Sequence, residues 1–321
     1  MNRKKIAFTL AGILIFGVFG GCKSFKETVL VNTLIFNMGD FQKLQLDYDA
    51  EDIHVLKSEN DKIVIYEYMN ENIKSYYART THKNGELIVT EGKRPRSSGF
   101  ESYIELHIPS DYKGSLSLHT TSGTIKSEFP LNISDNFSVD TTSGVIGVSS
   151  VNASIVSLAT TNGTIKGESL TSSSIKVVST NGNLSFENIN ADKIEIQTTN
   201  ADTRINEASG LISYESKGGN LTASDINGAG SFNALGDGSV NVSYNDVIGD
   251  IYIYSKNGRL ELKLPSQLAF KFSATTKGGV IDTSFTDQLT VTDGTAAGIV
   301  GSTPDIAIVM ETQNGDIKAS K

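Results

Sequence analysis

The sequence has no tryptophan, one cysteine and four histidines, and it has more acidic than basic residues. The single cysteine, Cys22, leaves no second thiol for a disulfide or a cysteine-ligated metal site. The 28 basic residues against 36 acidic ones give a net charge of −8, which argues against nucleic acid as a partner because that ligand needs a basic footprint. No long helical pattern follows the first 21 residues, so the fold must be built from strands.

The first 21 residues have the pattern of a targeting segment. Arg3, Lys4 and Lys5 precede an apolar run over residues 6–19, and Phe19-Gly20-Gly21-Cys22 ends that run with small residues before the cysteine. The arrangement resembles a bacterial lipoprotein signal, which implies cleavage before Cys22 and acylation of that residue. An ordinary secretory signal stays open, because phenylalanine stands where the lipoprotein motif usually has leucine. An uncleaved anchor helix also stays open, although the apolar run is shorter than the ~20 residues of a bilayer span.

We therefore predict a signal peptide over residues 1–21, a lipid-anchored tether over residues 22–40 and an exported mature protein. Within the tether, residues 29–36 are apolar enough to form a strand. Removal of the three basic residues of the leader leaves 25 basic and 36 acidic residues, a net charge of −11. This charge disfavours docking of the whole domain on anionic lipid, so the predicted membrane contact is the acyl anchor at Cys22.

From residue 120 to the C-terminus the chain repeats one short phrase ten times. Each copy has alternating apolar residues, a serine or threonine, a tight turn that usually ends in glycine, and another apolar residue, as in Val156, Leu158, Thr160, Gly163 and Ile165. Most copies lie 19 to 21 residues apart, and the fifth has Ala201 in place of the glycine. Such a period is the signature of stacked repeats, and alternation of period two indicates strands.

The turn residues support this interpretation. Asn-Gly, Asp-Gly and Ser-Gly pairs tolerate positive φ, so the glycines are predicted to hold that conformation, and the inward hydroxyl three residues earlier is expected to satisfy turn amides. The structural turn glycines are Gly123, Gly144, Gly163, Gly182, Gly219, Gly238, Gly258, Gly279 and Gly315. An apolar residue recurs seven positions after the glycine, as in Leu170 and Ile189, which gives three inward stripes and a coil with about three sides.

The predicted fold is all-β: a parallel β-solenoid of about ten coils over residues 111–321, with a period near 19. An antiparallel meander of two-residue hairpins is the competing architecture, because Asn-Gly is also the strongest hairpin signal. Residues 41–110 differ from the repeats and are predicted to form irregular cap strands, since terminal repeats are usually atypical. Predicted strands in this region cover residues 43–48, 53–56, 63–68, 87–90 and 103–108. The run over residues 93–99 is predicted to be an exposed loop.

A family resemblance agrees with this pattern. The segments Tyr103–Pro109 (YIELHIP) and Leu116–Ile125 (LSLHTTSGTI), followed by repeated T-T-S/N-G-x-I units, resemble the bacterial putative-adhesin family of domains of unknown function. The resemblance covers about residues 41–320. It implies a β-solenoid and surface attachment, and it brings no catalytic residues with it.

The residues themselves offer little chemistry. The four histidines, His54, His82, His107 and His119, show no metal-ligand spacing, and we predict no cofactor, no metal and no enzyme. Asp47, Asp49, Glu51 and Asp52 could supply oxygen ligands to calcium, but no glycine-punctuated ligand loop follows, so a solvated acidic edge is favoured. A polysaccharide-cleaving β-helix ranks last among the functions, because the outward positions are mostly small and polar.

The outward turn position suggests a binding face. The candidate residues form one column of threonines, namely Thr121, Thr142, Thr161, Thr180 and Thr199. Threonine ladders can bind ice, but here only one outward threonine per coil is in line. We predict an exported, lipid-anchored surface protein of adhesin-like type that displays this polar face to an extracellular protein or glycan. The alternative is an envelope-stress sensing lipoprotein that partners a membrane protein.

Overall fold

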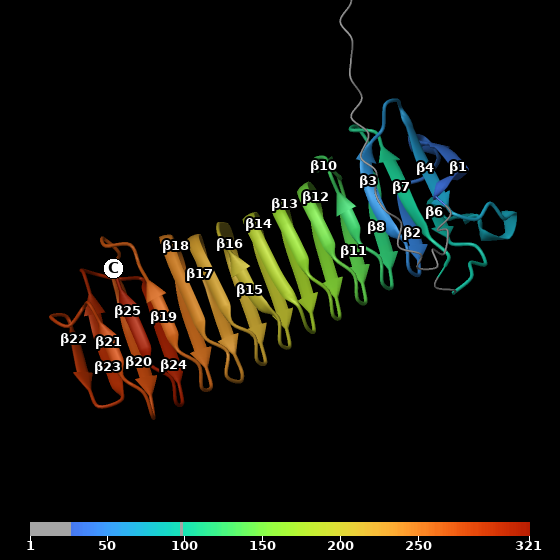
Figure 1. Cartoon of the computed structure of the whole chain (residues 1–321). Coiled ribbons are helices and arrows are strands. Elements are labelled where there is room, and N and C mark those ends of the chain that lie inside the picture. The colour runs from blue at the N-terminus through green and yellow to red at the C-terminus, as the bar shows by residue number, and fades with distance from the viewer. Residues whose placement is uncertain (1–26, 97–98) are drawn as a thin grey trace, which may run out of the picture.

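The structure is a computed structural model that describes residues 27–96 and 99–321, so the predicted signal peptide and Cys22 lie outside it. Within these residues, twenty-five strands form one continuous sheet, and two short 3-10 turns, Met38–Asp40 and Lys74–Tyr76, lie in the connections between strands. The sheet winds into an elongated stack, with β1 to β8 at one end and β18 to β25 at the other (Figure 1). Within the described ranges, no helix is long and apolar enough to cross a membrane.

The first repeat shows how one coil is built. Three short strands, β9 (Ile125–Ser127), β10 (Leu131–Asn132) and β11 (Asn136–Thr141), each pair in parallel with a different part of β12 (Ile146–Thr160). In later coils the three segments join into long bent strands. These are β12, β13 (Ile165–Ser179), β14 (Asn183–Thr198), β17 (Leu221–Ala234) and β18 (Val240–Ser255). The three predicted inward sides are therefore present.

The pairing between coils is parallel and in register. Ile146, Val151 and Val156 of β12 pair with residues 19 positions later, Ile165, Leu170 and Ile175 of β13. Two shorter strands, β15 (Asp202–Ile205) and β16 (Ala208–Ser216), continue the same ladder after β14. The repeats thus form a parallel β-solenoid, as predicted, and the hairpin meander is wrong.

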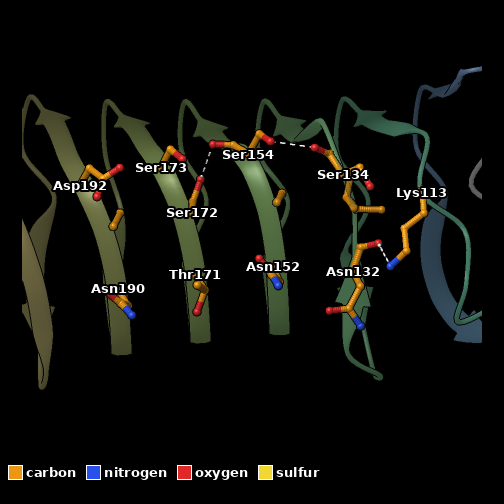
Figure 2. Close-up of a pocket in the computed structure, with 13 residues that line it drawn as sticks. Lys113, Asn132, Ser134, Asn152, Ser154, Thr171, Ser172, Ser173, Asn190 and Asp192 are labelled. Atoms are coloured by element: carbon orange, nitrogen blue, oxygen red, sulfur yellow. Dashed lines mark hydrogen bonds between the residues drawn. The ribbon is translucent and has the colours of Figure 1, made fainter.

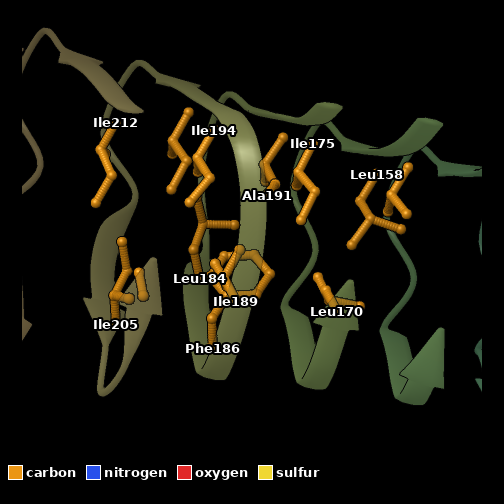
Figure 3. Close-up of a cluster of buried hydrophobic side chains, with 14 of the residues drawn as sticks. Leu158, Leu170, Ile175, Leu184, Phe186, Ile189, Ala191, Ile194, Ile205 and Ile212 are labelled. Carbon is orange, nitrogen blue, oxygen red and sulfur yellow. The ribbon is translucent and has the colours of Figure 1, made fainter. Parts of the chain in front are cut away.

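The core is a set of apolar columns that run along the axis. Figure 3 shows Ile175, Ile194 and Ile212 in one column, with Leu170 and Ile189 in a second column that faces it. Every one of these side chains is at most 1% exposed. Because each coil buries its apolar residues only against its neighbours, the stack holds one continuous core rather than separate ones.

The N-terminal cap does not follow chain order. β2 (Lys43–Tyr48) lies between β8 (Ser115–Thr120) and β6 (Glu86–Thr90), and β3 (Asp52–Lys57) lies between β9 and β7 (Ser102–Ile108). The first coil in the chain is therefore the second in space. Antiparallel strands complete the cap, namely β4 (Lys62–Met69) on β7, β1 (Val29–Asn37) on β4 and β5 (Arg79–Lys83) on β6. The predicted tether over residues 22–40 is therefore wrong for Val29–Asn37, which forms β1, and Leu34 and Phe36 of this strand pack against the core.

At the C-terminal end, too, the strands do not follow chain order. Its strands are β19 (Leu260–Lys263), β20 (Phe270–Thr276), β21 (Ile281–Thr283), β22 (Leu289–Thr292), β23 (Thr295–Val300), β24 (Ile306–Thr312) and β25 (Ile317–Ser320). β24 pairs in parallel with β18 on one side and with β20 on the other. The last copy of the repeat is thus inserted between the two copies that precede it, and an antiparallel pair, β22 and β23, covers β20.

Candidate functional site

The turn glycines line one edge of the solenoid, but for a reason other than the predicted one. Among them only Gly182 has a positive φ, of 118°. The others are required by close packing: a Cβ on Gly144 would lie 1.7 Å from the Gly123 carbonyl oxygen, and a Cβ on Gly163 would lie 1.8 Å from that of Gly144. The prediction of positive φ is therefore confirmed at Gly182 and wrong for the other turn glycines, where stacked turns leave no room for a side chain.

The predicted hydroxyl ladder is present beside the glycines. The Gly144 amide donates to Thr141 Oγ1 at 3.0 Å, the Gly163 amide to Thr160 Oγ1 at 2.9 Å, and the same contact recurs in later coils. These hydroxyls are buried, so each one satisfies a backbone donor that water cannot reach. The ladder fixes the geometry of the turn edge from coil to coil.

The candidate threonine column lies on the outside of these turns. Thr142, Thr161 and Thr180 are exposed, and Thr121 and Thr199 are half-buried. An amide ladder runs next to the column, in which Asn181 Nδ2 donates to Asn162 Oδ1 and Asn200 Nδ2 donates to Asn181 Oδ1, each at 2.9 Å. The threonines therefore lie on the outside of the turns, beside a hydrogen-bonded amide ladder.

A groove of about 590 Å³ lies at a different edge, where the second side of each coil meets the third. Figure 2 shows its polar side chains in rows that follow the stacking direction. One row holds Asn132, Asn152, Thr171 and Asn190, and the other holds Ser134, Ser154, Ser173 and Asp192. Because adjacent strands are about 4.8 Å apart, the groove offers a hydrogen-bonding group at that interval along its length.

Small residues create this groove, which we call the corner groove. Ala153, Ser172, Ala191 and Gly210 occupy the same corner position in successive coils, 19 residues apart. Gly210 continues the series beyond the residues that line the groove, and a Cβ there would lie 1.7 Å from the Ala191 carbonyl oxygen. Sequence reasoning did not single out these residues, although their regular spacing was a usable signal.

Hydrogen bonds between coils hold the groove open. Ser154 Oγ donates to the Ser134 carbonyl at 2.7 Å, and Ser172 Oγ donates to the Ser154 carbonyl at 2.9 Å. At one end Lys113 Nζ donates to the Asn132 carbonyl at 3.3 Å. Asp192 is the one carboxylate among the residues that line this groove. The surface is suited to hydrogen bonding with an extended polar ligand.

The acidic residues proposed for calcium do not converge. Glu51 is buried against Arg94, whereas Asp52 Oδ1 accepts the Thr124 amide at 2.6 Å. Asp47 Oδ1 lies 4.0 Å from Nε2 of His119. Among residues 27–96 and 99–321, no group of three histidine, cysteine or acidic side chains is arranged to hold a metal ion.

A buried charge cluster was missed by the sequence. Arg94, predicted to lie in an exposed loop, has a side chain that is 4% exposed; it pairs with Glu51 and Glu67 and lies 5.1 Å from the centre of the Tyr48 ring. Burial would raise the pKa of Glu51, but the Arg94 charge and hydrogen bonds lower it below its ordinary value. Burial raises the pKa of Glu91 to about 7, an effect opposed by the Asp49 amide and reinforced by Glu51.

This cluster closes the turn edge at its N-terminal end. Tyr48 pairs with Thr120, so a tyrosine stands where the hydroxyl ladder would otherwise continue. The carbonyl of Glu51 occupies the place beside Gly123 that a glycine carbonyl takes in later coils. The Arg94 guanidinium Nε then donates to the Tyr76 carbonyl at 3.1 Å, which ties the loop to the cap. The contacts indicate a structural role.

The histidines are dispersed over the cap and the first coils. His107 Nε2 lies 3.1 Å from Glu105, and the rings of His54 and Tyr103 are 6.1 Å apart. His119 contacts Asp140 of the next coil, so it does have an acidic partner, which its own strand does not supply. None of these pairs includes a nucleophile with an activating base.

Comparison with known proteins gives a consistent result. The profile of the family described as Toastrack DUF4097 matches residues 41–320. A crystal structure of a putative adhesin from Parabacteroides distasonis is similar in fold, with a TM-score of 0.53 and 12% identity over 72% of this chain and 96% of that one. Another, from Parabacteroides merdae, has a TM-score of 0.50 and 13% identity over 72% and 95%. No curated protein matches the sequence.

Proposed function

Since the chain belongs to the Toastrack DUF4097 family, we propose that it is an exported, lipid-anchored surface protein that acts by noncovalent, adhesin-like display. Solved proteins of similar fold are described as putative adhesins. The leader and Cys22 supply the proposed route to the membrane, with acylation at Cys22 holding the N-terminal end of the rod. An extracellular protein or glycan is the proposed ligand.

The corner groove is the observation that carries this proposal. It crosses several coils and presents amide and hydroxyl groups at a constant interval, which suits many weak contacts with one extended ligand. A repeating ligand would gain one set of hydrogen bonds per coil, and the sum would exceed any single contact. We therefore place binding in the corner groove first and on the threonine column second.

A catalytic role has less support. Glycoside cleavage requires two carboxyl groups on either side of the scissile bond, and the corner groove offers only Asp192. Glu51 and Glu67 are paired with Arg94 and buried in the cap, and half-buried Glu91 accepts the Asp49 amide, so these carboxylates serve structure. The proposed function is therefore binding without turnover.

Two double variants separate the proposed surfaces. Asn152→Lys with Asn190→Lys alters the corner groove, and Thr142→Lys with Thr180→Lys alters the turn edge. In each pair the sites are two coils apart, about 9.6 Å, so mutual repulsion of the new lysines is weak at physiological salt. All four positions are exposed, and each double variant should keep its unfolding midpoint.

The assay is attachment of cells that display each variant to arrays of glycans and matrix proteins. We expect the groove variant to lose attachment and the turn-edge variant to retain it. Loss of attachment in the turn-edge variant alone would indicate that the threonine column is the binding site. Attachment that survives both changes would refute display, and an envelope-stress response that fails in either variant would favour the sensing alternative. Release of sugar fragments by purified protein would point to an enzyme.

A further inference from the structure

The outer face of the N-terminal cap exposes apolar side chains that do not belong to the hydrophobic core. Leu30 and Ile35 of β1 are 47% and 63% exposed, whereas Leu34 and Phe36 of the same strand turn inward and pack on the core. Leu30 pairs with Tyr68 and Ile35 pairs with Val64, so the exposed residues share one face of the sheet. Exposed apolar side chains that share one face of a sheet are typical of an interaction site.

Tyrosines extend this surface, which we call the cap face and define as Leu30, Ile35, Tyr66, Tyr68 and Tyr103. Tyr68 pairs with Tyr103 across β4 and β7, and their rings stack with centres 4.5 Å apart and planes 5° apart. The hydroxyl of Tyr68 donates to Glu105 at 3.3 Å. All three tyrosines are half-buried, so part of each ring remains accessible to a partner.

The partner that fits is the lipid bilayer. A ring that buries its apolar body and keeps its hydroxyl in polar surroundings is typical of the membrane interface, and leucine and isoleucine beside it add apolar area. Stacking covers one face of both Tyr68 and Tyr103, which makes this surface a poor platform for a sugar ring. Apolar contact also does not require a basic surface, which this acidic chain lacks.

The length of the preceding chain supports the same partner. Val29, the first residue of β1, is seven residues after Cys22, and seven residues reach at most about 25 Å. An acylated Cys22 would therefore hold β1 within that distance of the lipid. Figure 1 places β1 at the capped end of the rod, away from the last coils.

We propose that the cap face rests on the bilayer surface, so that the anchored protein has a fixed orientation and its repeats project from a docked cap. The proposal rests on the proposed lipid anchor at Cys22. It predicts contact with zwitterionic lipid that is insensitive to salt, because the cap face carries no net positive charge.

The absence of tryptophan makes a direct test possible, since one introduced tryptophan is the only such fluorophore in the chain. The lipidated full chain is purified with Tyr68→Trp, reconstituted into phosphatidylcholine vesicles and compared with vesicles that contain brominated phosphatidylcholine, a short-range quencher. Tyr254→Trp is the matched control, because Tyr254 is also a half-buried outward tyrosine of a strand but lies in β18. We expect loss of most of the emission for Tyr68→Trp and unchanged emission for Tyr254→Trp.

The outcomes separate docking from anchoring. Protein that floats with the vesicles but shows equal emission in both lipids at Tyr68→Trp refutes docking and leaves the anchor intact. Protein that does not float refutes the anchor, and with it the proposed orientation. Adding Ile35→Asp should abolish quenching without affecting flotation, and quenching that persists would overturn the role of the cap face. If the tryptophan of Tyr68→Trp is shielded from solvent only when a membrane protein is cross-linked to it, the partner of the cap face is that protein and not lipid.

Discussion

Gly163→Ala should destabilise the solenoid strongly although alanine suits the backbone conformation there. Gly163 does not have a positive φ, so the substitution adds no torsional strain. Its new Cβ would lie 1.8 Å from the Gly144 carbonyl oxygen, and relief of that overlap requires adjacent turns to separate by more than an ångström. Separation weakens the bonds between these turns, from the Asn162 amide to the Thr142 carbonyl and from the Ile146 amide to the Thr164 carbonyl. At about 1 kcal/mol per hydrogen bond, with lost core contacts added, we expect a cost of about 3 kcal/mol.

Gly147→Ala is the matched control for this prediction. Gly147 lies in β12 on the outward side, and a Cβ there meets nothing closer than Lys126 Cγ at 3.6 Å. Alanine is favoured over glycine within a strand by roughly 0.5 kcal/mol or more, so this variant should be neutral or slightly stabilised. Urea unfolding of the mature protein, followed by far-ultraviolet circular dichroism, gives both midpoints. Equal midpoints for the two variants would refute the close-packing account of the glycine column.

Three further predictions test other parts of the molecule. Cys22→Ala should release the exported protein from the membrane fraction, and retention of unprocessed protein at wild-type levels would instead indicate a helical anchor. The pKa of Glu91 is raised to about 7 in the folded protein, so its protonated form stabilises the fold; this contribution is present below its ordinary pKa and is lost as pH rises through 7. Glu91→Gln should therefore reduce the difference between unfolding midpoints at pH 6 and pH 8, and an unchanged difference would contradict this origin. Arg94→Met should cost about 3 to 5 kcal/mol in a urea melt, because Glu51 and Glu67 would remain buried without their cation; a cost below about 1 kcal/mol would show that the cluster is solvated.

The repeat alone was sufficient to predict the solenoid. Strand alternation identified inward residues such as Ile175 and Leu184, which are buried, and the hydroxyl three residues before each glycine predicted the contact that Thr141 and Thr160 make. These features are local, because they depend on side-chain period and on turns of four residues. Local patterns of this kind can be found in one sequence without knowledge of its neighbours.

The candidate binding surfaces were harder to predict from the sequence than the fold. The threonine column could be located because it belongs to the repeated phrase, whereas the corner groove depends on small residues, such as Ala153 and Ala191, whose role is visible only where two sides of the coil meet. The sequence pattern around Arg94 was misleading: it predicts an exposed loop, but the Arg94 side chain is buried against Glu51 and Glu67, which are distant in the chain. Burial of a single side chain in a loop has no periodic signal.

The sequence by itself determined the strand segments, the direction of their side chains and the stacking of equivalent copies. Tertiary structure decided the order of the coils at both ends, where β24 enters between β18 and β20 and β2 lies between β6 and β8. It also decided that Val29–Asn37 is an edge strand on β4. The physical reason is that copies of one repeat present nearly equivalent edges, so the pattern within a strand permits several neighbours. The choice among them depends on how connecting segments and antiparallel cap strands pack around the exposed ends.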